Sequence, residues 1–243
     1  DFLIAQAAEG VGDAAEALAH YEKARRLDPS HSEAHYRAAL LARRLGRAGL
    51  SDSAMASYQH LQQMAEGDPD ALPELRTLRE AVIESGGQVD HIFALARFLG
   101  RHGYEDEALN RFQAVLARRP DDYRTLNHIG NIHLRRHQTE AALTAYERAA
   151  LAGPEFGPAL LNAGTAAMIL GRPRRARGYF ERVVTLTPRV SMGWFGLAAA
   201  HLEEGRPTVA DSLIDEGLLR SDPQGRTRQA LLELQRKARS RLP

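Results

Sequence analysis

The chain has 243 residues, of which 44% are apolar and 26% charged, and its formal net charge is +1. This balance gives no overall positive field of the kind that favours nucleic-acid binding. The absence of cysteine excludes disulfides, thiolate zinc sites and a cysteine nucleophile, and no apolar run approaches the roughly 18 to 20 residues of a membrane span.

Residues 1–66 are predicted to form two pairs of helices. The first pair combines a short helix near residues 1–9 with a longer second helix. The second pair carries three extra residues, which we expect in its turn, between Arg47 and Ser53. The residues that mark these helices are small, aromatic or turn-forming: Gly12, Ala17, Tyr21, Ala24, Pro29, His35, Ala38, Ala39, Gly46, Ala54 and Tyr58.

Residues 67–88 contain one further predicted helix, over residues 71–85. Asp70 is a suitable N-cap, Pro73 fits the first turn, and two glycines after Ser85 end the helix. Its apolar residues recur at helical spacing: Leu72, Leu75, Leu78, Val82 and Ile83. We expect this helix either to pack as an insertion that kinks the array or to act as a hinge or partner contact.

The stretch from residue 89 to residue 224 repeats with a period of 34 residues. Its prolines are spaced by 34: Pro120, Pro154 and Pro188. An aromatic stands eight residues before each proline: Phe112, Tyr146 and Phe180. An alanine stands twelve before: Ala108, Ala142 and Ala176. The predicted repeats are 89–122, 123–156, 157–190 and 191–224, the last with its proline one residue late, at Pro223.

This pattern resembles the tetratricopeptide repeat (TPR) family, in which small residues let the two helices of a hairpin touch and the aromatic fills the space between hairpins. The resemblance implies an all-α fold, a right-handed α-solenoid of TPR helical hairpins. Pro69 and Pro120 are 51 residues apart, one and a half periods, so helix 71–85 is expected to be unpaired. The implied organisation is an N-terminal sub-array, an inserted helix with linker, four repeats and a basic capping helix: 1–66, 67–88, 89–224 and 225–243.

The capping helix is predicted over residues 226–240. Its apolar stripe faces one side and its charges the other, as expected for a helix that closes an open solenoid end. Residues 224–243 carry six basic side chains and one acid. A basic docking face for an anionic partner is the alternative interpretation.

In the TPR family the ligand usually lies in a concave groove lined by the first helix of each hairpin. The resemblance places nine groove-facing residues in the repeats from 123 to 224 as a peptide-binding site: Arg124, Asn127, Asn131, Leu161, Asn162, Thr165, Met168, Met192 and Phe195. Asn131 and Asn162 are expected to hold a peptide backbone, since a carboxamide both donates and accepts. They are also expected to point away from the hairpin core. The apolar residues are expected to hold side chains, or, for Leu161 and Phe195, to close gaps between adjacent helices.

The chaperone-binding TPRs grip a C-terminal carboxylate with asparagines and cations at set repeat positions. This chain matches the asparagines, Asn131 and Asn162, but it has Asn127, Met192 and Gly196 where those proteins have cations. Binding of a chaperone tail is therefore not expected.

No motif for nucleotide binding, hydrolysis or metal catalysis occurs in the sequence. Two histidine pairs have the i, i+4 spacing of metal ligands, namely His31 with His35 and His133 with His137, but no third ligand stands nearby. Four arginines between Arg172 and Arg177 are interpreted as a solvated outer face or as a contact for an acidic partner. We expect no cofactor, no metal and no nucleic-acid partner.

Two functions remain from the sequence. The first is a non-enzymatic scaffold or adaptor that binds a protein or peptide in the groove. The second is the substrate-recognition TPR module of a larger bacterial enzyme, of glycosyl-, sulfo- or oxygenase type, with its catalytic domain outside this chain. Self-association through the ends of the solenoid is a third, weaker hypothesis.

Overall fold

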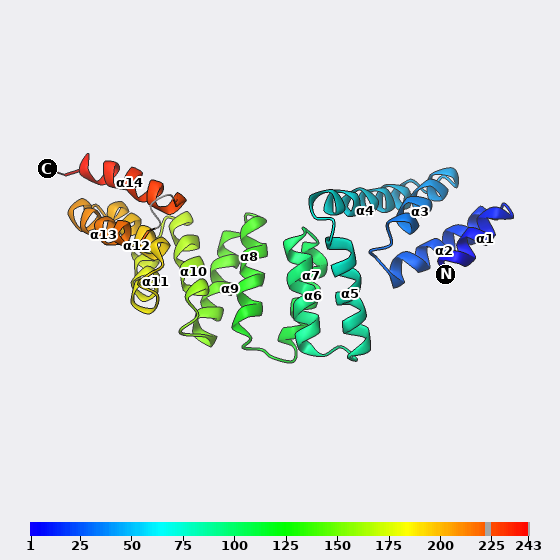
Figure 1. Ribbon diagram of the computed structural model, residues 1–243, viewed down its shortest axis with the longest axis horizontal. Helices are drawn as coiled ribbons and strands as arrows, with labels where there is room; N and C mark the ends of the chain where they lie inside the picture. The colour runs from blue at the N-terminus through cyan, green and yellow to red at the C-terminus, as the bar shows by residue number, and fades with distance from the viewer. Residues whose placement is uncertain (222–224, 243) are drawn as a thin grey trace. The chain divides into compact units, whose positions relative to one another are not determined.

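The computed structural model describes residues 1–221 and 225–242, and within them the chain forms fourteen α-helices and no strand (Figure 1). The predicted late proline, Pro223, lies outside the described residues. The all-α solenoid fold is confirmed. Contacts divide the chain into two compact units, residues 1–102 and 103–243. The boundaries proposed from the sequence at residues 66, 88 and 224 stay predictions.

The first unit is a succession of helices in which each packs against the next along the chain (Figure 1). Small side chains dominate its core, where Ala17, Ala38 and the ring of Tyr21 are fully buried. Alanine allows helix axes to approach closely, so the helices of this unit pack with little side-chain volume between them. The helices are α1 (Phe2–Gly10), α2 (Ala14–Leu27), α3 (Ser32–Arg44), α4 (Ala48–Gly67), α5 (Ala71–Glu84) and α6 (Val89–Arg101).

The three extra residues of the second pair do not lengthen its turn, so that expectation was wrong. Helix α4 begins at Ala48, directly after a short turn around Gly46, and runs for 20 residues, against 14 in α2. No proline interrupts α4, and Gly49 lies in its first turn. The hydroxyl of Ser51 donates to the carbonyl of Ala39 at 3.0 Å in a buried position, so it fixes the added helical turn onto α3.

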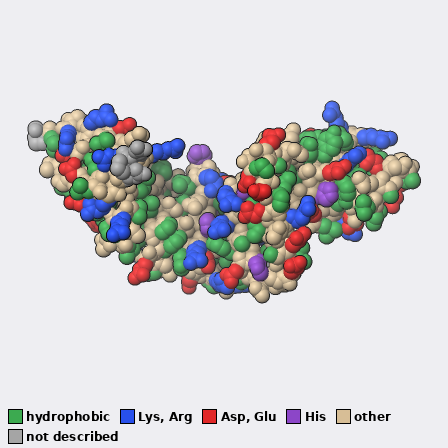
Figure 2. Space-filling model, in the orientation of Figure 1, with side chains coloured by type: hydrophobic (Ala, Val, Ile, Leu, Met, Phe, Trp, Pro, Cys, Tyr) green, Lys and Arg blue, Asp and Glu red, His purple; other side chains and the backbone are tan. Residues whose placement is uncertain are grey.

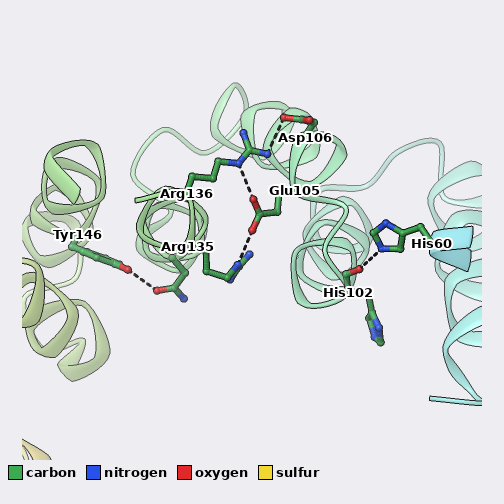
Figure 3. Close-up of polar contacts among 8 residues, drawn as sticks. His60, His102, Glu105, Asp106, Arg135, Arg136 and Tyr146 are labelled. Carbon is green, nitrogen blue, oxygen red and sulfur yellow. Dashed lines mark hydrogen bonds and ion pairs between the residues drawn. The ribbon is translucent and has the colours of Figure 1, made fainter. Parts of the chain in front are cut away.

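The predicted extra helix is present as α5, and it packs against both α4 and α6. Ala71 and Leu75 are fully buried, whereas Ile83 at the other end is 75% exposed. The Nε2 atom of His60, on α4, donates to the main-chain carbonyl of His102 at 2.8 Å (Figure 3). This bond ties α4 to the residue that follows α6.

The second unit consists of an inner and an outer layer of helices, and within each layer successive helices start at a constant spacing in the sequence. Inner helices α8, α10 and α12 begin 34 residues apart, as do outer helices α9, α11 and α13. The inner helices also contact one another: α8 contacts α10, α10 contacts α12 and α12 contacts α14. These contacts define the inner layer. The helices are α7 (Glu105–Leu116), α8 (Tyr123–Arg135), α9 (Thr139–Ala152), α10 (Gly157–Ile169), α11 (Pro173–Leu186), α12 (Ser191–Glu203), α13 (Pro207–Arg220) and α14 (Arg226–Arg239).

Aromatic rings of the outer layer lie directly on glycines of the inner layer. A Cβ at Gly130 would lie 2.5 Å from the Tyr146 ring. The Phe180 ring lies between Gly164 and Gly196, where a Cβ would come within 2.6 and 2.4 Å of it. Interiors are close-packed, so these contacts set the spacing of the inner helices.

Helix α14 covers the end of the second unit as the predicted cap. Leu231 and Ala238 are fully buried against the cluster that includes Leu202 and Ile214 of α12 and α13. Its polar side chains pair with acids of the preceding helices at 2.7 to 3.1 Å: Lys237 with Glu203, Arg239 with Asp211 and Gln235 with Asp215. Two of the six basic residues noted in the sequence, Lys237 and Arg239, therefore help to attach the cap.

We expect Gly130→Ala to destabilise the second unit by about 1–3 kcal/mol, because its Cβ would overlap the Tyr146 ring. Gly178→Ala, in helix α11, is the matched control, since no atom lies within 4 Å of its added Cβ. The control should gain up to about 1 kcal/mol from helix propensity. Urea unfolding followed by Trp194 fluorescence measures both variants, and equal stability of the two would contradict the packing described.

Candidate functional site

The nine predicted peptide-binding residues lie on three adjacent inner helices of the second unit. We call the surface that they form the α8–α10–α12 face. Arg124, Thr165 and Met192 are exposed on it, and Asn127 is buried. The other five residues are half-buried: Asn131, Leu161, Asn162, Met168 and Phe195. The structure thus brings together on neighbouring helices residues that are up to 71 positions apart in the sequence.

Three of these residues form a network of carboxamides. The Nδ2 group of Asn162 donates to Oδ1 of Asn127 at 3.0 Å and to Oδ1 of Asn131 at 3.2 Å. The hydroxyl of Tyr146, from outer helix α9, donates to the same Oδ1 of Asn131 at 2.8 Å (Figure 3). The sequence analysis expected Asn131 to point away from the hairpin core. In the structure one end of its side chain faces the core, because its Oδ1 atom accepts from the hydroxyl of the buried Tyr146.

Tyr146 is a member of this site that sequence reasoning assigned only to packing. Its side chain is fully buried, and burial raises the pKa of the phenol to about 12, so the hydroxyl keeps its proton. The only indication in the sequence is the identity of the aromatic residue. The equivalent positions in the neighbouring repeats hold Phe112 and Phe180, which have no hydroxyl.

The apolar residues of the face are partly engaged in the core. Leu161 and Met168 pack against the cluster that contains Ala163 and Ala167, and Phe195 packs against Leu202 and its neighbours. Leu161 and Phe195 are thus partly buried, and their expected role in closing gaps between adjacent helices stays a prediction. Met192 is 42% exposed and Ile169 is 60% exposed, so the same face also presents apolar surface to solvent.

The cations of α8 differ in their pairing. At its C-terminal end, Arg135 and Arg136 each hold Glu105 at 2.7 Å (Figure 3). Burial alone would raise the pKa of Glu105, but the hydrogen bonds from both arginines outweigh it and hold that pKa below its ordinary value. At the other end, Arg124 lies over the Tyr123 ring at 5.7 Å and has no acidic partner among the described residues.

The arginines between Arg172 and Arg177 are mostly engaged in ion pairs between neighbouring helices. Arg172 pairs with Glu140, Arg175 with Glu147 and Arg177 with Glu204. Arg172, Arg174 and Arg175 border a hollow of about 540 Å³ near the N-terminal ends of α11 and α13. Acidic and basic side chains are interspersed over the surface seen in Figure 2. The cluster is therefore chiefly a set of links between helices.

The histidine pairs have structural roles in the described residues. His137 adopts φ = 59° in the turn that glycines occupy in other repeats, and His133 Nδ1 lies 2.7 Å from Gln138 Oε1. His31 caps α3, and His35 is buried with its Nε2 donating to the carbonyl of Pro29 at 3.0 Å. Residues 1–221 and 225–242 contain no group of three or more histidines and acids placed to hold a metal ion.

Comparisons with known proteins place this geometry among repeat proteins. A family model described as tetratricopeptide repeat matches residues 2–69, 93–159 and 161–226. No curated protein sequence matches the chain. No helix in the described part of the chain is long and apolar enough to cross a membrane.

Several solved structures are similar in fold. YrrB, described as a TPR protein with an unusual peptide-binding site, is 21% identical, with a TM-score of 0.56 over 68% of this chain and 92% of its own. MamA is 15% identical, with a TM-score of 0.56 over 66% of this chain and 93% of its own. Yeast Tom70 is 17% identical, with a TM-score of 0.55 over 93% of this chain and 43% of its own.

The buried His35 gives a pH-dependent prediction. Burial, followed by the nearby Arg25 charge, lowers the pKa of His35 from 6.5 to about 4. The unfolded chain therefore binds the proton first as the pH falls below about 6.5, and stability that is fully present above that pH is lost towards pH 4. We expect a loss of about 2 kcal/mol at pH 5 relative to pH 7.

Urea unfolding followed by circular dichroism at both pH values measures this loss. His35→Gln keeps a side-chain donor but cannot titrate, so the part of the pH dependence that comes from His35 should disappear in that variant. An equal loss in the wild type and the variant would show that His35 does not cause it.

Proposed function

Because the chain belongs to the tetratricopeptide repeat family, we propose that it is a non-enzymatic scaffold that binds an extended peptide segment of another protein on the α8–α10–α12 face. TPR proteins of similar fold include YrrB, which is described as having an unusual peptide-binding site. That description concerns YrrB, and it supports a peptide as the class of ligand proposed here. In the proposed complex the α8–α10–α12 face is the concave groove of the solenoid.

The carboxamide network is the observation that carries this proposal. Each carboxamide has a carbonyl and an NH2 group, and the network uses one end of each. The Nδ2 groups of Asn127 and Asn131 and the Oδ1 atom of Asn162 have no hydrogen-bond partner in the described part of the chain. Two donors and one acceptor on adjacent helices match the alternating carbonyl and N–H groups of an extended backbone.

The remaining residues of the face would select side chains. Met168 and Met192 adapt to irregular shapes, and together with the exposed parts of Leu161 and Phe195 they would hold one or two apolar side chains. Arg124, which lacks an acidic partner in the described residues, would favour an acidic residue at the α8 end of the peptide. The proposed ligand is therefore an extended segment with an acidic and an apolar part.

A peptide for the test can be selected from a random 12-residue library displayed on phage. We expect Asn162→Ala to weaken binding of the selected peptide by about 5- to 150-fold, because a lost hydrogen bond with a buried partner costs about 1–3 kcal/mol. Asn131→Asp should weaken it on the same scale. The aspartate still accepts from Tyr146 and Asn162, so the fold is kept while the free N–H is lost. Titration calorimetry gives the affinities.

Two controls accompany these variants. Asn110→Ala makes the same change on an exposed position of outer helix α7 and should leave binding unchanged. Arg175→Ala removes contacts with Glu147 and Tyr179, both of the outer layer, and should do little. Loss of binding in Arg175→Ala with normal binding in both network variants would contradict the proposal and place the ligand on the outer layer.

A further inference from the structure

The three carboxamides can satisfy one another in two opposite ways. In the structure, Asn162 donates through Nδ2 to the carbonyls of Asn127 and Asn131. If all three groups were turned over, the carbonyl of Asn162 would accept from the two NH2 groups instead. The first arrangement presents two donors and one acceptor to a ligand, and the reversed arrangement presents two acceptors and one donor. Taken alone, the network does not distinguish them.

The hydroxyl of Tyr146 removes this ambiguity. It donates to Oδ1 of Asn131 at 2.8 Å, and that atom is the only acceptor it has in the described part of the chain. In the reversed arrangement the phenol would face an NH2 group, and its proton would be buried without an acceptor. A buried donor without a partner disfavours that arrangement by about 5- to 150-fold. The raised pKa of Tyr146 is consistent with a phenol that keeps its proton.

The neighbouring repeats provide an internal comparison. The Phe112 ring stacks on His128, with centroids 5.5 Å apart and an interplanar angle of 3°. Phe180 lies against Gly196, where the preceding repeat has Asn162, so no carboxamide faces that ring. Among these three equivalent positions, only the one next to the asparagines of α8 and α10 holds a tyrosine, Tyr146. Gly130 lets its ring reach them.

We propose that Tyr146 is a positioning residue, whose hydroxyl fixes the three carboxamides so that the α8–α10–α12 face offers two N–H donors from α8 and one carbonyl acceptor from α10. The positioning role has a consequence for the ligand, and that consequence rests on the proposed function. The bound backbone must direct two carbonyl oxygens towards Asn127 and Asn131 and an N–H group towards Asn162. A ligand with the opposite pattern would place its N–H groups against the NH2 groups of Asn127 and Asn131, and it would bind more weakly.

The first test needs no ligand. Solvent exchange of the Asn127, Asn131 and Asn162 side-chain NH2 protons can be measured by nitrogen-edited NMR. In the wild type, the Asn162 protons should exchange about tenfold more slowly than those of Asn131, since only the former donate within the network. In Tyr146→Phe both arrangements become populated, and this ratio should fall at least about threefold.

Tyr21→Phe is the matched control. Tyr21 is also fully buried, and its hydroxyl donates to Glu9 at 2.9 Å in the first unit. The Tyr21→Phe variant loses a comparable hydrogen bond and leaves the hydrogen bonds of the asparagines unchanged. An unchanged exchange ratio in Tyr146→Phe, or the same fall in Tyr21→Phe, would overturn the positioning role.

The second test uses the peptide selected from the phage library. Tyr146→Phe should bind it about 3- to 30-fold more weakly, and Tyr21→Phe should bind it like the wild type. Normal affinity in Tyr146→Phe would overturn the consequence drawn for the ligand. If no library peptide binds the wild-type protein, the proposed function fails, and the exchange measurement still decides whether Tyr146 orients the network.

Discussion

The contact of an outer-layer aromatic ring with the backbone of an inner-layer glycine is the constraint on which the second unit depends. Tyr146 on Gly130, and Phe180 between Gly164 and Gly196, leave no room for a Cβ. These contacts fix how far apart α8, α10 and α12 lie. That spacing lets Asn162 reach across to two asparagines of the preceding inner helix, so the packing of the core determines the polar pattern of the proposed binding surface.

The sequence allowed most of the helices to be predicted, because the repeat is a local pattern of small, aromatic and turn residues. The extra residues after Gly46 were misplaced, since Gly49 and the Ser51–Ser53 segment favour a turn locally. The helix that they form instead is held by a tertiary hydrogen bond from Ser51 to Ala39. The nine residues of the proposed site were selected from their repeat positions, and that assignment stays a prediction. Their hydrogen bonds were not predicted, because the bond from Tyr146 to Asn131 depends on the distance between two helices, which the sequence does not state.

The arginine cluster in the sequence corresponds largely to contacts between helices in the structure. Most of the arginines around Arg175 pair with acids of neighbouring helices, and in α14 Lys237 and Arg239 do the same. Exposed pairs of this kind contribute little stability individually, but they leave few cations available to a ligand. Arg124 differs because it lies over the Tyr123 ring and has no acidic partner in residues 1–221 and 225–242. The proposed role of Arg124 in binding therefore rests on its lack of an acidic partner in the described residues and not on the number of basic residues around it.

Hydrogen–deuterium exchange of the protein with and without its selected peptide tests the central claim most directly, since it locates the bound segment without altering any residue. The α8–α10–α12 account predicts slower exchange in Tyr123–Arg135, Gly157–Ile169 and Ser191–Glu203, with no change in Thr139–Ala152 or Pro173–Leu186. Protection confined to these last two helices would show that the peptide binds the outer layer and would contradict the account.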